Sequence, residues 1–127
     1  MGFPLCLWGS MAIDFTNFPW IAPWQAISAR GREAYENELG LEVTPGHPLY
    51  GVPIKAVGRT CHGDDILYEL LNHPAQLAVV HLTFTGRPER EPRWPSVTFY
   101  SDLDHWVARG LMPDIARYES DPSNRAA

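Results

Sequence analysis

The sequence contains very little cysteine. Only Cys6 and Cys61 occur among its 127 residues, far apart and outside any C-x-x-C pair. A disulfide framework or a zinc site built on thiolates needs more cysteines at closer spacing, so neither is expected. The same scarcity is typical of proteins from a reducing compartment, and we therefore expect a cytoplasmic location.

The sequence also lacks a long hydrophobic run. No stretch reaches the roughly 18 consecutive apolar residues that a membrane-spanning helix requires, so we expect no membrane association. The opening residues are apolar, but they have no basic start and are interrupted by Pro4 and Gly9, which argues against a signal peptide. Met11 is an alternative start of translation, and residues 1–20 are expected to form an irregular N-terminal arm.

Clusters of positive charge are missing as well. The formal net charge is -5, and the arginines of the segment 85–95 alternate with acidic residues instead of forming a basic patch. Binding to nucleic acid depends on clustered Lys and Arg side chains that neutralise phosphates. We therefore expect no nucleic-acid partner.

The common catalytic motifs do not occur in this sequence. There is no G-x-S-x-G, Walker loop, G-x-G-x-x-G, H-E-x-x-H or EF-hand spacing. His62, Asp64 and Asp65 lie close together and have ligand chemistry, with His73 or His47 as possible additions. Asp and Gly are also the ordinary residues of turns, so we predict no metal site, no cofactor and no catalytic residue.

Hydrophobic periodicity predicts two amphipathic helices. The first covers residues 23–40, with Pro23 at its first position and Gly40 at its end. The second follows a capping box at residues 101–104, and Pro113 either ends it or restarts a short turn.

Four segments have the composition of β-strands, namely residues 54–60, 65–71, 76–84 and 96–100. The order helix, four strands, helix contains no strand-helix-strand crossover, which favours an antiparallel meander. Ala78, Val80 and Leu82 form a wholly apolar set on the third strand, and we expect both helices to cover this face. The predicted fold is an α+β two-layer sandwich, with a four-stranded antiparallel meander and an N-terminal and a C-terminal helix on one face. The single domain is expected over residues 21–118, followed by a frayed tail over 119–127.

His81 is unusual because it lies in the middle of the apolar strand AVVHLTF. Strand alternation points it away from the apolar set, on the same side as Thr83, with Tyr68 or Glu69 on the neighbouring strand. One interpretation is a half-exposed imidazole bonded to these neighbours, and another is a binding or catalytic position. We predict that His81 keeps a hydrogen bond, with Thr83 or Tyr68 as its partner, and contributes to recognition rather than covalent chemistry.

The string PGHPLYG, residues 45–51, is the most constrained part of the sequence. It predicts either a rigid corner that buries Leu49 and Tyr50 or a preordered recognition loop. Trp94 and several N-terminal aromatic residues lie outside the predicted helical stripes, and indicate an arm packed on the sheet or a partner surface. His47, Tyr50 and Trp94 join His81, Thr83 and Tyr68 as candidate binding residues.

The run from PGHPLYG through AVVHLTF to RWP resembles a group of small, uncharacterised bacterial proteins that share the PGHPLYG and VVHLT pattern. The resemblance covers about residues 30–110. It implies no activity, substrate or catalytic residue.

These observations favour a non-enzymatic domain that binds another protein, of the small acidic kind found among inhibitors and immunity proteins. One alternative is a small-ligand or hydrolytic site on the open sheet face around His81, which a pocket walled by His81, Thr83, Tyr68 and Trp94 would favour. The other is a structural homodimer. The expected partner is thus another protein or a second copy of the chain.

Overall fold

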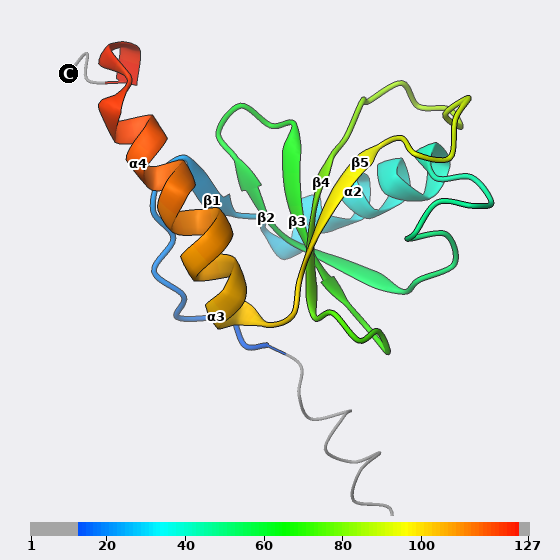
Figure 1. The fold of residues 1–127 in the computed structure, drawn as a ribbon, viewed down its shortest axis with the longest axis horizontal. Helices are drawn as coiled ribbons and strands as arrows, with labels where there is room; N and C mark the ends of the chain where they lie inside the picture. The colour runs from blue at the N-terminus through cyan, green and yellow to red at the C-terminus, as the bar shows by residue number, and fades with distance from the viewer. Residues whose placement is uncertain (1–12, 125–127) are drawn as a thin grey trace, which may run out of the picture.

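A computed structural model describes residues 13–124 of the protein, and a five-stranded antiparallel sheet forms its centre (Figure 1). The strands follow one another as a meander: β1 (Trp24–Ala26), β2 (Ile54–Thr60), β3 (Asp65–Leu70), β4 (Leu77–His81) and β5 (Ser96–Tyr100). The helical elements are α2 (Ala29–Glu42), α3 (Leu103–Trp106), a π-helical turn (Val107–Leu111), α4 (Met112–Ser120) and a 3-10 turn (Pro122–Asn124). The α+β class and the antiparallel sheet predicted from the sequence are confirmed. No helix within residues 13–124 is long and apolar enough to cross a membrane.

The sheet has five strands instead of the predicted four, because Trp24–Ala26 pairs with β2. The prediction of a helix from residue 23 is therefore wrong at its start. The helix begins after Ser28, whose hydroxyl accepts a hydrogen bond from the backbone N–H of Gly31. The position of Trp24 fits the spacing of the predicted helical stripe. In the structure, however, Trp24 belongs to strand β1, and its ring packs on the sheet. At the other end, α2 continues through Gly40 to Glu42.

The helices lie on opposite faces of the sheet, so the predicted two-layer sandwich with both helices on one face is wrong. On one face, α2 packs with Tyr68, Ala78 and Val80. On the other, the C-terminal helices pack with Leu67 and Leu77, which are also fully buried. The central strands carry apolar side chains on both faces, and each set needs a layer that removes it from water.

Aromatic side chains form the core of the second face. Trp106 is fully buried, and the rings of Phe18, Trp20 and Trp24 lie 5.9, 6.1 and 5.3 Å from it. Residues 13–20 contain no helix or strand, yet they cross this face and contribute the first two of these rings. Phe15, Phe18 and Trp20 are thus used in packing. Trp8 and the alternative start at Met11 lie outside the described residues.

The C-terminal helix changes its winding where Pro113 occurs. Asp102 caps the start by accepting the N–H of His105, and the π-helical turn then carries a bond from Met112 N–H to Val107 O. Pro113, which has no N–H to donate, falls in the first turn of α4. The α-helix therefore resumes at Met112, beside this proline, and continues to Ser120.

Candidate functional site

Two long loops meet on the right of the sheet in Figure 1, and α4 lies on the left. One is the segment 43–53, which contains PGHPLYG, and the other is the segment 82–95 between β4 and β5. Gly46 has a left-handed φ of 100° and lies so close to Pro92 that a Cβ there would be 3.2 Å from its ring. The two loops are therefore in contact.

His47 joins these loops from the inside. Its Nδ1 accepts the N–H of Leu49 at 2.9 Å, and its Nε2 lies 2.8 Å from the carbonyl oxygen of Pro95. Because a carbonyl oxygen can only accept, Nε2 carries the proton and the ring is neutral with both nitrogens satisfied. His47, a candidate binding residue in the sequence, is thus buried and holds the loops together.

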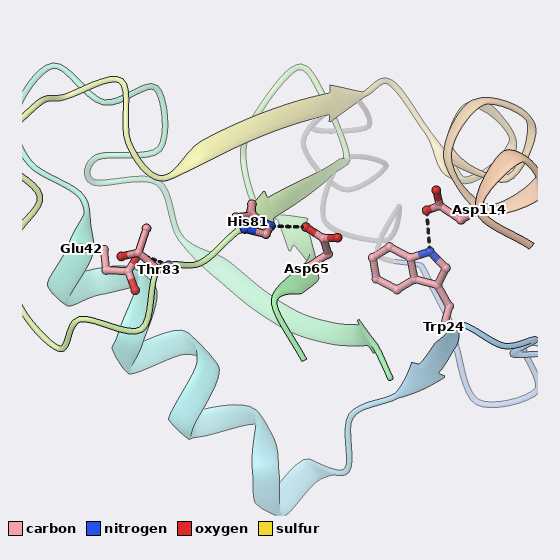
Figure 2. Close-up of polar contacts among 6 residues, drawn as sticks. All are labelled: Trp24, Glu42, Asp65, His81, Thr83 and Asp114. Carbon is pink, nitrogen blue, oxygen red and sulfur yellow. Dashed lines mark hydrogen bonds and ion pairs between the residues drawn. The ribbon is translucent and has the colours of Figure 1, made fainter. Parts of the chain in front are cut away.

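Glu42 makes a second connection between the loops, and sequence reasoning missed it. It is 0% exposed, and one of its carboxylate oxygens accepts the backbone N–H of Thr83 at 3.0 Å (Figure 2). The other oxygen accepts the backbone N–H of Phe84 at 2.8 Å. Burial first, and then a hydrogen bond with the Glu38 side chain, raise the pKa of Glu42 to about 7, although the bonds from Thr83 and Phe84 act in the opposite direction. Glu38 in turn accepts the N–H of Gly86. The end of α2 therefore holds the start of the loop 82–95 through carboxyl groups.

Thr83 belongs to this connection and does not pair with His81. Its backbone N–H is bonded to Glu42, and its hydroxyl donates to the carboxylate of Glu89. The backbone N–H of Glu89 donates a hydrogen bond to the carbonyl oxygen of Glu42. Thr83 is therefore a structural element of the loop.

Three exposed aromatic side chains are carried by these connected loops. Tyr50, Phe84 and Trp94 have 55%, 45% and 42% of their surface exposed, and we call this set the aromatic end. The guanidinium of Arg93 lies 5.6 Å from the ring centre of Trp94. Beside Tyr50, a groove of about 400 Å³ runs between α2 and the loop 43–53. Its apolar lining residues are Leu39, Val43, Leu49, Tyr50, Val52 and Ile54.

His81 is the last residue of β4, and it lies in a row of polar residues across three strands. Asp65 on β3 and Ser96 on β5 are its direct neighbours in the register. Its Nδ1 is 2.8 Å from Oδ1 of Asp65, in an exposed hydrogen bond (Figure 2). The partner of His81 is thus Asp65, and the predicted partners Thr83 and Tyr68 are wrong.

Tyr68 lies on the opposite face of the sheet from His81. It pairs with Ala78, is fully buried, and its hydroxyl donates to the carbonyl oxygen of Tyr35 at 2.7 Å. Burial, together with the charges of nearby glutamates, raises the pKa of Tyr68. Tyr68 is therefore a core residue and cannot line a pocket with His81.

The candidate residues thus separate into distinct groups. His47, Tyr50, Thr83 and Trp94 belong to the two loops, while His81 and Tyr68 belong to the sheet and lie on its opposite faces. In the part of the chain that the structure describes, no three His, Cys, Asp or Glu side chains are grouped to hold a metal ion. No family model, curated protein or solved structure matches this chain.

Proposed function

We propose that this protein is a non-enzymatic interaction domain of the cytoplasm that binds another protein through the aromatic end. The observation that carries this proposal is the exposure of Tyr50, Phe84 and Trp94 on two loops that Glu42 and His47 hold from inside. The free, exposed thiol of Cys61 is consistent with a reducing compartment.

Preorganised loops favour tight binding. A loop that is already held in place loses little conformational entropy when a partner binds. Tyr, Trp and Arg side chains dominate the binding energy of known protein interfaces, and Tyr50, Trp94 and Arg93 supply these residue types. The net charge of -5 favours a partner with a basic surface, since opposite charge accelerates association.

Photo-crosslinking in the native host tests this proposal. A photoreactive phenylalanine analogue at position 50 is expected to capture one recurring protein, and a second copy of this chain as the product would identify a homodimer. The matched control is position 112, because Met112 is 54% exposed on α4, away from the loops. Equal capture from both positions would contradict the proposal.

Direct binding then measures the contribution of the aromatic end. With the captured protein purified, Tyr50→Ser and Trp94→Ser are each expected to weaken binding at least about tenfold, as for central interface aromatics. Met112→Ser is expected to leave binding unchanged. If the two aromatic variants bind like the wild type, the interaction surface lies elsewhere.

A hydrolytic site is the second candidate function, and the register of His81 favours it. Asp65 contacts the imidazole through Nδ1, and Ser96, which is exposed, is the register partner of His81 on β5. Such a row has the chemistry of a serine nucleophile, a base and an orienting carboxylate. The test is hydrolysis of an activated ester such as p-nitrophenyl acetate. A rate that Ser96→Ala and Asp65→Asn both abolish would support this function, and an unchanged rate would exclude it.

A further inference from the structure

β5, drawn in yellow in Figure 1, is the last strand in the order of the sheet. It pairs with β4 on one side, in an unbroken register from Ser96 to Tyr100. A strand at the edge of a sheet leaves half of its backbone N–H and C=O groups without a partner in that sheet. These groups can pair with a strand of another chain.

The hydrogen bonds of β4 show how the backbone groups of the two strands are directed. Along a strand in an antiparallel sheet, successive residues turn their N–H and C=O groups to opposite neighbours. Beyond one end of β4, the N–H of Leu82 donates to the carbonyl oxygen of Asp64. Before the other end, the carbonyl oxygen of Gln76 accepts the N–H of Leu70. The even-numbered residues of β4 therefore face β3, and the odd-numbered residues face β5.

Val97 and Phe99 consequently direct their backbone groups away from the sheet. The odd-numbered residues of β4 are paired with Ser96, Thr98 and Tyr100, so these three residues use their N–H and C=O groups toward β4. The two residues between them face outward. Within residues 13–124, no other segment pairs with this side of β5.

β5 lacks the features by which proteins protect an edge strand. Its sequence SVTFY contains no charged residue and no proline, and its register with β4 has no bulge. Ser96 and Thr98 are also exposed. The opposite edge is formed by β1, which is only three residues long and offers fewer groups for pairing. Of the two edges, β5 is thus the one suited to pair with another strand.

Both ends of β5 are already bonded within the protein, and this limits the register of a further pairing. Pro95 has no N–H, and its carbonyl oxygen lies 2.8 Å from Nε2 of His47. At the other end, the N–H of Ser101 donates to Nδ1 of His105, and its carbonyl oxygen accepts the N–H of Gln76. Only the two outward residues between these ends are available.

We propose that β5 pairs antiparallel with β5 of a second copy of this chain, about a two-fold axis at Thr98, so that the two sheets join into one. In this register Val97 lies opposite Phe99 of the other copy, and each such pair exchanges two N–H···O bonds. All four outward groups of each strand are then satisfied. A shift by two residues in either direction would place Pro95 or Ser101 opposite an outward residue and would satisfy fewer groups.

The side chains match in the same register. Val97 beside Phe99 is a pair of a β-branched and an aromatic residue, and Thr98 beside its own copy is a pair of hydroxyls, both of which stabilise antiparallel strands. No charges meet, although each chain carries a net charge of -5. Because the strand is complementary to itself, a second copy fits it better than an unrelated strand does.

Sedimentation velocity of the full chain tests whether the dimer forms. One strand pair is a small contact, so we expect a reversible monomer–dimer equilibrium with Kd on the order of 10–100 micromolar. A chain that stays monomeric at concentrations well above this value would overturn the proposal.

Amide hydrogen exchange identifies the strand that pairs. The N–H groups of Val97 and Phe99 are expected to exchange more slowly as the protein concentration rises, because they are bonded only in the dimer. The N–H of Thr98 faces β4 in both states, so its exchange should depend much less on concentration. A dimer in which the exchange of Val97 and Phe99 does not change would place the interface elsewhere and overturn the proposal.

Charge at the two-fold axis provides the second test. Thr98 is exposed, so Thr98→Lys and Thr98→Glu are expected to fold like the wild type, which circular dichroism checks. Each variant alone should dimerise at least about tenfold more weakly, because like charges lie directly opposite each other. An equimolar mixture of the two should restore a dimer, since Lys then meets Glu. Two variants that dimerise like the wild type would overturn the proposal.

Two control variants separate this interface from other surfaces. Gln25→Lys adds the same charge to the exposed side of β1 and is expected to leave the dimer unchanged. Tyr50→Ser alters the aromatic end and should also leave it unchanged, since the pairing of β5 does not depend on the binding proposed for that end. Loss of the dimer in Tyr50→Ser while Thr98→Lys still dimerises would place the interface at the aromatic end and overturn the proposal.

Discussion

The carboxylate of Glu42 accepts the backbone N–H of Phe84 at 2.8 Å, although Glu42 is fully buried and Phe84 has a left-handed backbone with φ of 56°. A left-handed conformation is uncommon for a bulky side chain and persists only where surrounding contacts hold it. Glu42 supplies this contact, and it also accepts the N–H of Thr83. One carboxyl group therefore shapes the start of the loop that carries Trp94.

Stability should fall as the pH rises through the titration of Glu42. The pKa of Glu42 is raised from its ordinary 4.5 to about 7, chiefly by burial, so the folded state holds a proton that the unfolded state releases. This contribution is fully present below about pH 4.5 and is lost as the pH approaches and passes 7. The loss is on the order of 2–3 kcal/mol.

Urea unfolding at pH 5 and pH 8 measures this effect, with Glu42→Gln as the comparison. The variant is expected to lose most of the pH dependence, since an amide does not titrate. A variant with the same slope as the wild type would show that other groups produce the dependence.

Gly58→Ala should destabilise the protein because Trp20 lies directly on Gly58. A Cβ at this position would be 2.5 Å from the Trp20 ring, which must then shift within the aromatic core of the second face. The expected cost is about 1–3 kcal/mol, as for other overpacked sites, measured by urea unfolding. Gly40→Ala is the matched control, because nothing lies within 4 Å of a Cβ there. That change in α2 should stabilise the protein by about 0.5–1 kcal/mol.

Phe18→Ala should show that the segment 13–20 is part of the core. The Phe18 ring lies 4.8 Å from Trp20 and 5.9 Å from Trp106. Because the side chain is only partly buried, the expected loss is about 1–3 kcal/mol, below the range for a fully buried Phe. Thermal unfolding measures this loss. Phe84→Ala changes an exposed side chain, so it should lower the free energy of unfolding by less. Equal losses of stability would mean that Phe18 stabilises the protein no more than an exposed aromatic residue does.

His47→Ala should loosen both loops at once. The change leaves the buried N–H of Leu49 and the carbonyl oxygen of Pro95 without their partners. We expect a loss of about 2–4 kcal/mol, since each buried group left unpaired costs about 1–3 kcal/mol. Hydrogen exchange should become faster in both segments 43–53 and 82–95. Faster exchange in the first segment alone would show that His47 does not couple the loops.

Much of the sheet could be predicted from the sequence. The strand expected at 96–100 has these bounds in the structure, and those at 54–60 and 65–71 differ by at most one residue. Alternating apolar residues between turn-forming residues depend only on local geometry, so they appear in the sequence itself. Tyr50 and Trp94, which belong to the connected loops, are candidates for other reasons: Tyr50 is part of the PGHPLYG string, and Trp94 lies outside the predicted helical stripes.

Other parts of the candidate site could not be predicted. Glu42 looks like an ordinary surface residue at a helix end, and its role depends on backbone groups of Thr83 and Phe84, about forty positions later. Tyr68 was placed beside His81 because the register of two strands cannot be derived from their alternation. A shift of one residue moves every side chain to the other face.

The sequence by itself determined four of the five β-strands, their antiparallel order and the α+β class, because these depend on periodicity and on connections too short for a crossover. Only the tertiary structure decided which layer covers each face. Leu67 and Leu77 lie on the face opposite Ala78, so both faces of the sheet had to be covered by another layer. The C-terminal helices cover the second face because this buries Trp106 together with the N-terminal aromatic rings. It also decided the partners of His47, Glu42 and His81, since a buried or paired polar group is satisfied by whichever distant segment folding brings within hydrogen-bond distance.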